Sequence, residues 1–509
     1  MELYSPKAQK PGNFRKNTVK NNSTVNVNKR ATLTGETIIF EMNKIPGGLC
    51  TAWRLKGYTF DISMHMLTGS VSGPINKMWE ELGVTRNFKF HSHNHISQIE
   101  GMGKKLFLST NRNELEDEML AISPADAKLI KEFIRIIFGP DMMKAASLKP
   151  AELKNLFDKL KLIPAILPLI RIFIKYNKVT LQEFASRFKD PFMREAIRFF
   201  IDAPGWPMPR FPLMVMAGYV KSGVTEAGTP LGGSQKVAFH IAGLYKKLGG
   251  EIHYKTHVND LIIENNKVVG IKMKDGSEHW ADKVIWAGDG HTLIFDILGG
   301  KYMNDRIRNM YDNWIPVKPI VHVMIGVNMD LSKEPHRTVF EAEEPITIAG
   351  HEHRWLTVLH HCFDKSMAPA GKSAVEVWFD TEYDYWEELA KDRIKYNAEK
   401  QRIADYTIRQ LEKRWPGFSS KTEVIDVPTP TTYMRYTGNW KGSPDGWYLT
   451  PDNINEMEPL RTLPGIEGLH MVGQWTTTFS GTVIAALSGR QVIQLICKKE
   501  AKKFVSNGV

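Results

Sequence analysis

An acidic side chain followed by two adjacent glycines is the first combination in this sequence that could do chemistry. Residues 37–41 are typical of a buried strand ending in Glu41, and Gly47 and Gly48 lie in the loop that follows. A carboxylate at the end of a strand can accept two hydrogen bonds from the diol of a ribose. Paired glycines let the backbone approach a ligand where any Cβ would collide. The segment therefore predicts one wall of a nucleotide-binding site, with Glu41 on the ribose.

The element that should precede this wall is not recognisable. A Rossmann unit begins with an apolar strand and a GxGxxG turn that opens a helix, about 20 residues before the ribose-binding acid. Residues 13–34 contain no glycine and are dominated by Lys, Asn, Thr and Ser, which do not bury themselves in a parallel sheet. Two hypotheses follow: residues 1–35 are an aberrant segment translated in a wrong frame, or the protein genuinely lacks the loop.

Further along the chain, helix and strand patterns alternate. The pattern predicts a helix from Ser234 to Leu248, ended by Gly249 and Gly250, and a hairpin turn at Asp275-Gly276. Strands are predicted at Glu251–Tyr254, Val258–Glu264, Val268–Met273 and Lys283–Ala287. Residues 463–499 read as a strand, a glycine-bearing turn and an apolar helix. Segments typical of a nucleotide-binding site thus occur near both ends of the chain, which predicts one discontinuous domain.

The segments between these parts have other periodicities. Residues 74–211 are dominated by helical patterns, residues 317–379 read as strands, and residues 386–415 form a charged helix. The stretch from Leu162 to Tyr176 is strongly apolar but is interrupted by prolines and Arg171. Two interpretations of it stay open: a core helix with a proline-broken start, or a segment that lies on a bilayer.

Composition narrows the class of protein. With 509 residues, 42% apolar and 24% charged, the chain can bury a large core in two or three globular units. Its three cysteines lack the spacing of a disulfide framework or a zinc site, and the N-terminal residues lack the apolar core of a secretory signal. We expect a cytoplasmic protein, either free or peripheral on a membrane. The net charge of +11 favours an anionic neighbour, but no nucleic-acid-binding signature accompanies it.

Three blocks of the sequence carry a resemblance to a known family. They are "FEMNKIPGGLCTAWRLKGYTFD", the block from Pro230 to Gly290 that begins "PLGGSQKVAFHIAGLYKKLGGEIHY", and "LPGIEGLHMVGQWTTTFSGTVIAALSGRQVIQ". In this order and spacing they resemble the phytoene desaturase, carotenoid isomerase and retinol saturase group of FAD-dependent oxidoreductases in the amine-oxidase-like superfamily. The resemblance covers almost the whole chain beyond residue 36. It implies an α/β fold with a discontinuous Rossmann-like FAD-binding domain and an inserted α+β substrate domain that carries a helical subdomain.

The resemblance also implies roles for individual residues in binding FAD. The backbone of Val258 would pair with the adenine edge, and Ala287 and Gly288 would end a strand that approaches the cofactor. Gly473 and the turn Gly481-Thr482-Val483 would open the last helix, whose positive end could stabilise the pyrophosphate or a reduced flavin anion. Two positions depart from the family pattern: Leu49 stands where many relatives carry arginine, and Ser480 replaces a glycine.

Other groups of histidines in the sequence do not predict a metal site or a catalytic site. Alternate histidines in "HSHNH", His91 to His95, share one face of a strand, but no acidic or cysteine partner is evident, and we predict no metal site. His291 and the pair His360-His361 lack a Ser/His/Asp arrangement, so hydrolase chemistry is not supported. We name no catalytic residue, because the flavin would carry the chemistry.

The expected function is FAD-dependent desaturation, saturation or isomerisation of a long apolar polyene or similar lipid. Two alternatives stay open: a non-catalytic lipid- or partner-binding remnant of the fold, and a flavin amine oxidase. The stretches 162–176 and 203–219 are the candidates for membrane contact and substrate passage. The expected domain parts are an aberrant or disordered segment (1–35), FAD-binding parts (36–105, 215–298 and 446–509), a helical part (106–214) and a substrate domain (299–445).

Overall fold

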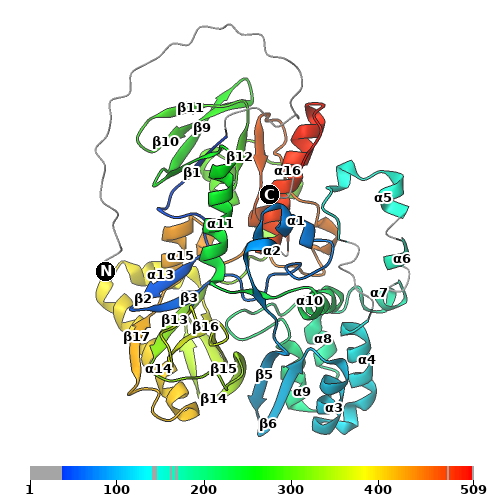
Figure 1. Ribbon diagram of the computed structural model, residues 1–509, viewed down its shortest axis with the longest axis vertical. Coiled ribbons are helices and arrows are strands. Elements are labelled where there is room, and N and C mark those ends of the chain that lie inside the picture. Colours follow the sequence, from blue (N-terminus) through cyan, green and yellow to red (C-terminus); the bar gives the residue numbers. More distant parts are fainter. Residues whose placement is uncertain (1–36, 140–145, 161–162, 167–169, 479–480, 507–509) are drawn as a thin grey trace. The chain divides into compact units, whose positions relative to one another are not determined.

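The computed structural model describes residues 37–139, 146–160, 163–166, 170–478 and 481–506 (Figure 1). Residues 36–509 form one compact unit. The domain boundaries that the sequence predicts inside residues 36–509 stay a prediction. None of the described helices is long and apolar enough to cross a membrane.

A seven-stranded sheet is the largest element of the compact unit. Neighbouring strands are antiparallel except β14 and β5, which run parallel. In spatial order the strands are β17 (Thr422–Asp426), β13 (Ile320–Val327), β16 (Ser373–Asp380), β15 (His351–His360), β14 (Arg337–Ile348), β5 (His95–Gly101) and β6 (Lys104–Ser109).

The two faces of this sheet differ in chemistry. Successive side chains of a strand alternate between faces, so Val321, Val323 and Ile325 share one face of β13. They pack with residues of the charged helical region, which is two helices, α13 (Tyr383–Ala390) and α14 (Arg393–Arg414). The side chain of Asp392 caps the N-terminus of the second helix, so a new helix begins after this residue. The opposite face, which we call the inner face, carries Ile320, His322 and Met324 from β13.

Helices from the middle of the chain pack beside β5 and β6 in Figure 1. Their aromatic core includes Phe133, Phe184 and Phe192, and Val339 of β14 packs against the same cluster. The helices are α3 (Arg112–Ile122), α4 (Ala127–Ile137), α8 (Leu181–Ala185), α9 (Pro191–Arg198) and α10 (Leu213–Thr225).

Strands β5 and β6 interrupt the part that the sequence pattern marks as helical. They form a hairpin whose turn passes through Met102 and Gly103, both of which have positive φ. Ile99, Leu106 and Leu108 of the hairpin are buried. The short strand β4 (Phe90–His91), which pairs with β7 (Thr229–Pro230), also lies in this part of the chain.

Two short parallel pairs of strands form the remaining part. Strand β1 (Ile38–Glu41) pairs with β8 (Glu251–Tyr254), and β12 (Val284–Trp286) pairs with β18 (Leu469–Met471). Side chains from both pairs, including Phe40 and Trp286, belong to one apolar cluster. The other elements here are helix α11 (Gly233–Lys247), the antiparallel strands β9 (Val258–Glu264), β10 (Lys267–Met273) and β11 (Glu278–Trp280), the hairpin β2 (Ala52–Leu55) and β3 (Tyr58–Asp61), and helix α16 (Thr482–Lys499).

The predicted elements of this part are confirmed to within one or two residues. Strands β8 and β9 have the predicted bounds, and α11 begins and ends one residue before its predicted limits. The hairpin turn at Asp275-Gly276 is also present: Gly276 has a φ of 86°, and Asp275 accepts a hydrogen bond from the amide of Ser277.

Candidate functional site

Glu41 lies at the end of β1, where its carboxylate is half-buried. Its Oε1 accepts a hydrogen bond from the amide of Asn43 at 2.7 Å. Burial raises the pKa of Glu41, although the hydrogen bonds with Asn43 act in the opposite direction. Hydroxyl groups of a ligand would supply further donors and stabilise the charged form.

A backbone hydrogen bond to Glu41 holds the start of β9, and with it Val258, close to Glu41. The amide of Thr256 donates to the carbonyl oxygen of Glu41 at 2.9 Å, and β9 begins two residues later at Val258. Phe40 and Val258 also pack against the same apolar cluster. The structure therefore brings together the two residues that the resemblance assigns to ribose and adenine.

Gly47 is fixed by close packing against helix α11. It has a φ of 110°, and a Cβ at this position would lie 2.8 Å from the Cβ of Ala238 and 2.5 Å from the carbonyl oxygen of Cys50. Any side chain would push the loop away from α11. Gly48, with a φ of 57°, has no atom within 4 Å of the position of a Cβ. Leu49 packs against Trp378 and Leu359 of the inner face.

The end of β12 meets the end of β18. The amide of Val472 donates to the carbonyl oxygen of Trp286 at 2.9 Å, which aligns Ala287 with Gly473. The carbonyl oxygen of Ala287 lies 3.6 Å from where a Cβ on Gly473 would stand. Gly288 lies against the Trp286 ring. The predicted residues Ala287, Gly288 and Gly473 thus form one junction.

The entry of helix α16 is held by an acidic side chain. Gly481 has a φ of 90°, and its amide donates to Oδ1 of Asp445 at 3.1 Å. A carboxylate already interacts with this helix N-terminus, so an anionic ligand would have to share the positive end with Asp445. Val483, in the first turn, packs in one cluster with Cys50 and Val237, which joins the turn to the diglycine loop and α11.

A hydrogen-bonded group of charged residues connects α11 to the inner face, and sequence reasoning missed it. Asp61, at the end of β3, accepts hydrogen bonds from the amide and the hydroxyl of Ser234 at the start of α11. The Asp61 amide donates to Oε1 of Glu376 at 3.0 Å. His322 and His361 place their Nε2 atoms 3.0 and 3.2 Å from the oxygens of Glu376.

The protonation of this group follows from its partners. Burial alone would raise the pKa of Glu376, but the charge and hydrogen bond of His322, together with those of His361, lower it well below its ordinary value. Burial likewise opposes protonation of His361, but the hydrogen bond and charge of Glu376 raise its pKa. Glu376 is therefore a carboxylate bonded to imidazoles. Burial lowers the pKa of the neighbouring His65 to about 4 despite the charge of Glu376, so His65 is neutral near pH 7.

Two histidines of "HSHNH", His91 and His93, lie in an aromatic stack, whereas His95 contacts the carboxylate of Glu114 at 3.3 Å. The ring of His93 lies 3.5 Å from that of His336 and 4.5 Å from that of His91. Burial lowers the pKa of His93 to about 3, with a further contribution from His91. Over the residues that the structure describes, no group of three His, Cys, Asp or Glu side chains could hold a metal ion.

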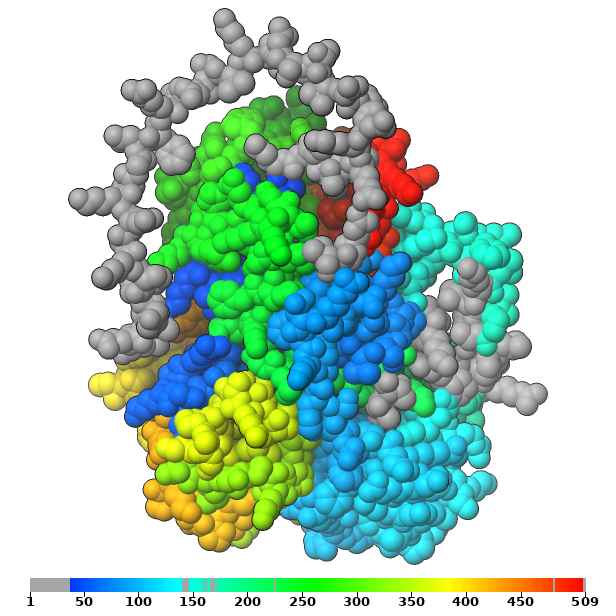
Figure 2. Space-filling model, viewed as in Figure 1, coloured from blue at the N-terminus to red at the C-terminus, as the bar shows by residue number. Residues whose placement is uncertain are grey.

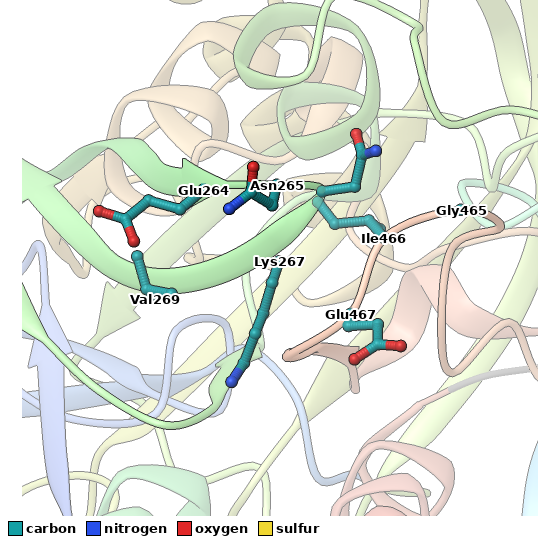
Figure 3. A pocket seen from close by; sticks show the side chains of 8 residues that line it. Glu264, Asn265, Lys267, Val269, Gly465, Ile466 and Glu467 are labelled. Carbon is teal, nitrogen blue, oxygen red and sulfur yellow. The ribbon is translucent and has the colours of Figure 1, made fainter.

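A shallow hollow lies beside the turn between β9 and β10 (Figure 3). The charged residues Glu264, Lys267 and Glu467 line this hollow together with the apolar residue Ile466. None of the residues predicted to bind FAD lines this hollow. We assign it no role.

Comparison with known proteins defines the class. Two solved structures share the fold over most of both chains. An oxidoreductase from Methanosarcina mazei is 17% identical, with a TM-score of 0.57, and covers 91% of this chain and 94% of its own. Cyclohexylamine oxidase from Brevibacterium oxydans is 13% identical, with a TM-score of 0.53, and covers 90% and 93%. The predicted α/β fold of the FAD-binding type is confirmed.

The family follows from the sequence match. The model of the flavin containing amine oxidoreductases matches residues 32–497, and the chain belongs to this family of FAD-dependent oxidoreductases. Prolycopene isomerase from Daucus carota is 24% identical over 89% of this chain and 74% of its own length. All-trans-retinol 13,14-reductase from Danio rerio is 19% identical over 90% and 81%. The resemblance stated from the sequence is confirmed, and with it FAD as the cofactor of the family.

The described residues fit the two ends of FAD. Glu41 has acceptor capacity for a ribose, and the diglycine loop, the Gly473 junction and the Gly481 turn lie around α11 and α16. The middle of FAD would need backbone donors from a strand, loop and helix beside β1, and among the described residues β1 pairs only with β8. Ile38 and Ile39 of β1 are each 43% exposed, as expected for a strand with an uncovered apolar surface.

Proposed function

We propose that the protein is an FAD-dependent oxidoreductase that desaturates, saturates or isomerises a long apolar polyene of the carotenoid or retinoid type. The observation that carries the proposal is the meeting of the diglycine loop, α11 and the α16 turn in one apolar cluster, next to the inner face of the large sheet. The names of the curated relatives, prolycopene isomerase and all-trans-retinol reductase, support this class of substrate.

Bound FAD would supply the hydride chemistry, and the chain's residues would orient the polyene. Aromatic side chains line the inner face for this purpose: Trp206 and Trp378 have ring centroids 5.9 Å apart, and His65 lies 4.9 Å from Trp378. Flat rings of this kind pack well against a conjugated chain. Trp206 belongs to the stretch 203–219, which the sequence predicts as a substrate passage.

We also propose that the 509-residue chain binds FAD weakly. A phosphate-binding loop contributes several amide donors and a helix dipole, each worth roughly 0.5 to 3 kcal/mol when charge-assisted. Residues 1–35 contain no GxGxxG pattern that could provide them. Every 1.4 kcal/mol that is lost lowers the affinity about tenfold, so losing several donors lowers it by orders of magnitude.

An exposed apolar patch supports a peripheral contact with a membrane. Helices α5 (Leu156–Leu160), α6 (Ile163–Ile166) and α7 (Ile170–Tyr176) lie at one side of the molecule in Figure 2, where residues near 160 are coloured cyan. Large apolar side chains are exposed there, and Leu156 and Ile174 reach 73% and 72%. The patch consists of Leu156, Phe157, Leu160, Ile163, Ile170, Phe173 and Ile174.

The patch supports the second interpretation of the stretch from 162 to 176, a segment that lies on a bilayer. Tyr176 is buried, as a core helix requires, but Ile163, Ile170 and Ile174 are exposed. Large apolar side chains exposed on three consecutive helices are typical of an interaction site. The net charge of +11 favours anionic lipid as its partner.

Turnover tests the proposal. The protein, incubated with an excess of FAD, is mixed separately with phytoene, prolycopene and all-trans-retinol, and the products are separated and identified by their absorbance spectra. Conversion of one of them is the expected result. Peroxide release with putrescine and no polyene conversion would indicate a flavin amine oxidase instead. Polyene binding with neither FAD binding nor conversion would indicate the non-catalytic remnant.

A further inference from the structure

Arg337 is a half-buried cation on the inner face of the large sheet. It is the first residue of β14, and the alternation of side chains places it on the same face as Val339, which packs with the middle helices. Phe340, on the opposite face, packs with the cluster of α13 and α14. Arg337 therefore points toward α10 and the inner face.

No acidic side chain neutralises Arg337 within the described part of the chain. Its Nε atom is buried and has no hydrogen-bond partner. Burial lowers the pKa of its guanidinium, and only the interaction with Tyr219 of α10 acts in the opposite direction. An unpaired charge whose donor atom is shielded from water is unfavourable, so proteins rarely keep one without a function.

The imidazoles around Arg337 are neutral. Burial lowers the pKa of His65 to about 4, and the charge of Arg337 contributes in the same direction. Burial also lowers the pKa of His336 well below its ordinary value, and His93, the charge of His360 and Arg337 add to this effect. Of Arg337, His65 and His336, only the guanidinium is charged, while Glu376, Asp61 and His361 also act on His65.

Arg337 is connected to the predicted flavin site through Tyr219. Burial raises the pKa of Tyr219, Arg337 lowers it, and Asp445 raises it, so Tyr219 lies within electrostatic reach of both charges. Asp445 in turn accepts the amide of Gly481 at the entry of α16. Tyr219 is also the last residue of the stretch 203–219, the predicted substrate passage. Arg337, Tyr219 and His65 are each half-buried.

We propose that Arg337 binds a carboxylate at one end of an otherwise apolar ligand chain. A guanidinium matches a carboxylate with two parallel hydrogen bonds, and the two unit charges neutralise each other. A phosphate ester would bring a second negative charge that the neutral histidines do not balance. The inference rests on the proposed function, since the polyene would lie along Trp206 and Trp378, and it specifies polyene acids as the preferred members of the substrate class.

Binding of a matched acid and alcohol tests this assignment without requiring flavin. The probes are all-trans-retinoic acid and all-trans-retinol, titrated at pH 8 while the quenching of tryptophan fluorescence is followed. The unmodified protein is expected to bind the acid about tenfold to a hundredfold more tightly, the range of a charge-assisted hydrogen-bonded pair. Arg337→Met should remove this preference and retain the affinity for retinol, which also shows that the variant is folded. Arg354→Met is the matched control, because Arg354 lies exposed on the neighbouring strand β15.

Each other outcome has a defined meaning. Equal affinities of the unmodified protein for acid and alcohol, or an acid preference that persists in Arg337→Met, overturn the role of Arg337 and leave the proposed polyene function standing. Absence of binding of both probes overturns the apolar ligand class, and the inference falls with it. Loss of the acid preference in Arg354→Met would also contradict the assignment, because that side chain lies on the surface.

Discussion

Replacing Gly233 by alanine should strongly destabilise the protein, because this glycine lies against the carboxylate that caps helix α11. Gly233 has a φ of 75°, and a Cβ there would lie 2.2 Å from Oδ2 of Asp61. The left-handed backbone alone costs an alanine about 1 to 2 kcal/mol. Displacing Asp61 from the Ser234 amide removes a cap worth roughly 0.5 to 2 kcal/mol and a charge-assisted hydrogen bond worth about 1.5 to 3 kcal/mol, which overlap in part. We expect a total loss of about 3 to 5 kcal/mol.

Gly243 provides a control in the same helix. It is exposed, and no atom lies within 4 Å of the position of a Cβ. Gly243→Ala should stabilise the protein by about 0.5 to 1 kcal/mol, because alanine loses less backbone entropy in a helix. Urea unfolding followed by tryptophan fluorescence measures both variants.

A double-mutant cycle isolates the contact between Gly233 and Asp61. In an Asp61→Ala background, Gly233→Ala should cost only the backbone part, about 1 to 2 kcal/mol. If Gly233→Ala costs the same with and without Asp61, or if it unfolds at the same urea concentration as Gly243→Ala, the inferred role of Asp61 in holding α11 is wrong.

The remaining predictions concern pH and membranes. The raised pKa of His361 stabilises the fold below about pH 6.5 and loses that effect as pH rises through the raised value, whereas the lowered pKa of Glu376 stabilises it above about pH 4.5. The stability difference between the unmodified protein and Glu376→Gln should therefore be larger at pH 5.5 than at pH 8.5 in urea unfolding, and equal differences would contradict the pairing. The double variant Phe157→Glu, Ile174→Glu should no longer float with anionic liposomes, because both changes place a charge in the exposed apolar patch. The control is Ile394→Glu, which changes an isoleucine that is 83% exposed on α14 and should leave flotation unchanged. Unchanged flotation of the double variant would exclude the patch as the membrane contact.

The local elements of the nucleotide-binding part could be predicted because their signals are local. The alternation of apolar and polar residues and the glycines at the ends of elements predicted the bounds of β8, β9 and α11 to within one residue. The hairpin of β5 and β6 was missed because helical periodicity on both sides dominates its neighbourhood. The break between α13 and α14 was missed although Asp392, a favourable capping residue, marks it.

The charged group on the inner face could not be assembled from sequence alone. Asp61 and Glu376 are 315 residues apart, and only the fold brings the end of β3 against β16. One signal was available: His322 and Glu376 are the ionisable residues inside otherwise apolar strands, "IVHVMIGV" and "SAVEVW". An ionisable residue within a strand buried on both faces needs a partner or a function. The same argument applies to Arg337, whose partner is absent from the described residues.

The predicted FAD-binding residues stay predictions, although the structure brings many of them together. Glu41 adjoins Val258 through the backbone, and Val483 shares a cluster with Cys50 beside the diglycine loop. Roles toward a ligand depend on the ligand itself, and neither periodicity nor packing among protein atoms assigns them. Binding experiments must do so.

Titration of FAD, followed by the quenching of its fluorescence, tests the central claim most directly. Two proteins are compared: the 509-residue chain, and a chain in which a strand, GxGxxG loop and helix replace residues 1–35. We predict weak binding by the first and tight, saturable binding by the second, which Glu41→Gln should weaken about tenfold or more through loss of the charge-assisted hydrogen bonds to ribose. Absence of saturable binding by both proteins, or an affinity indifferent to Glu41, would contradict the account.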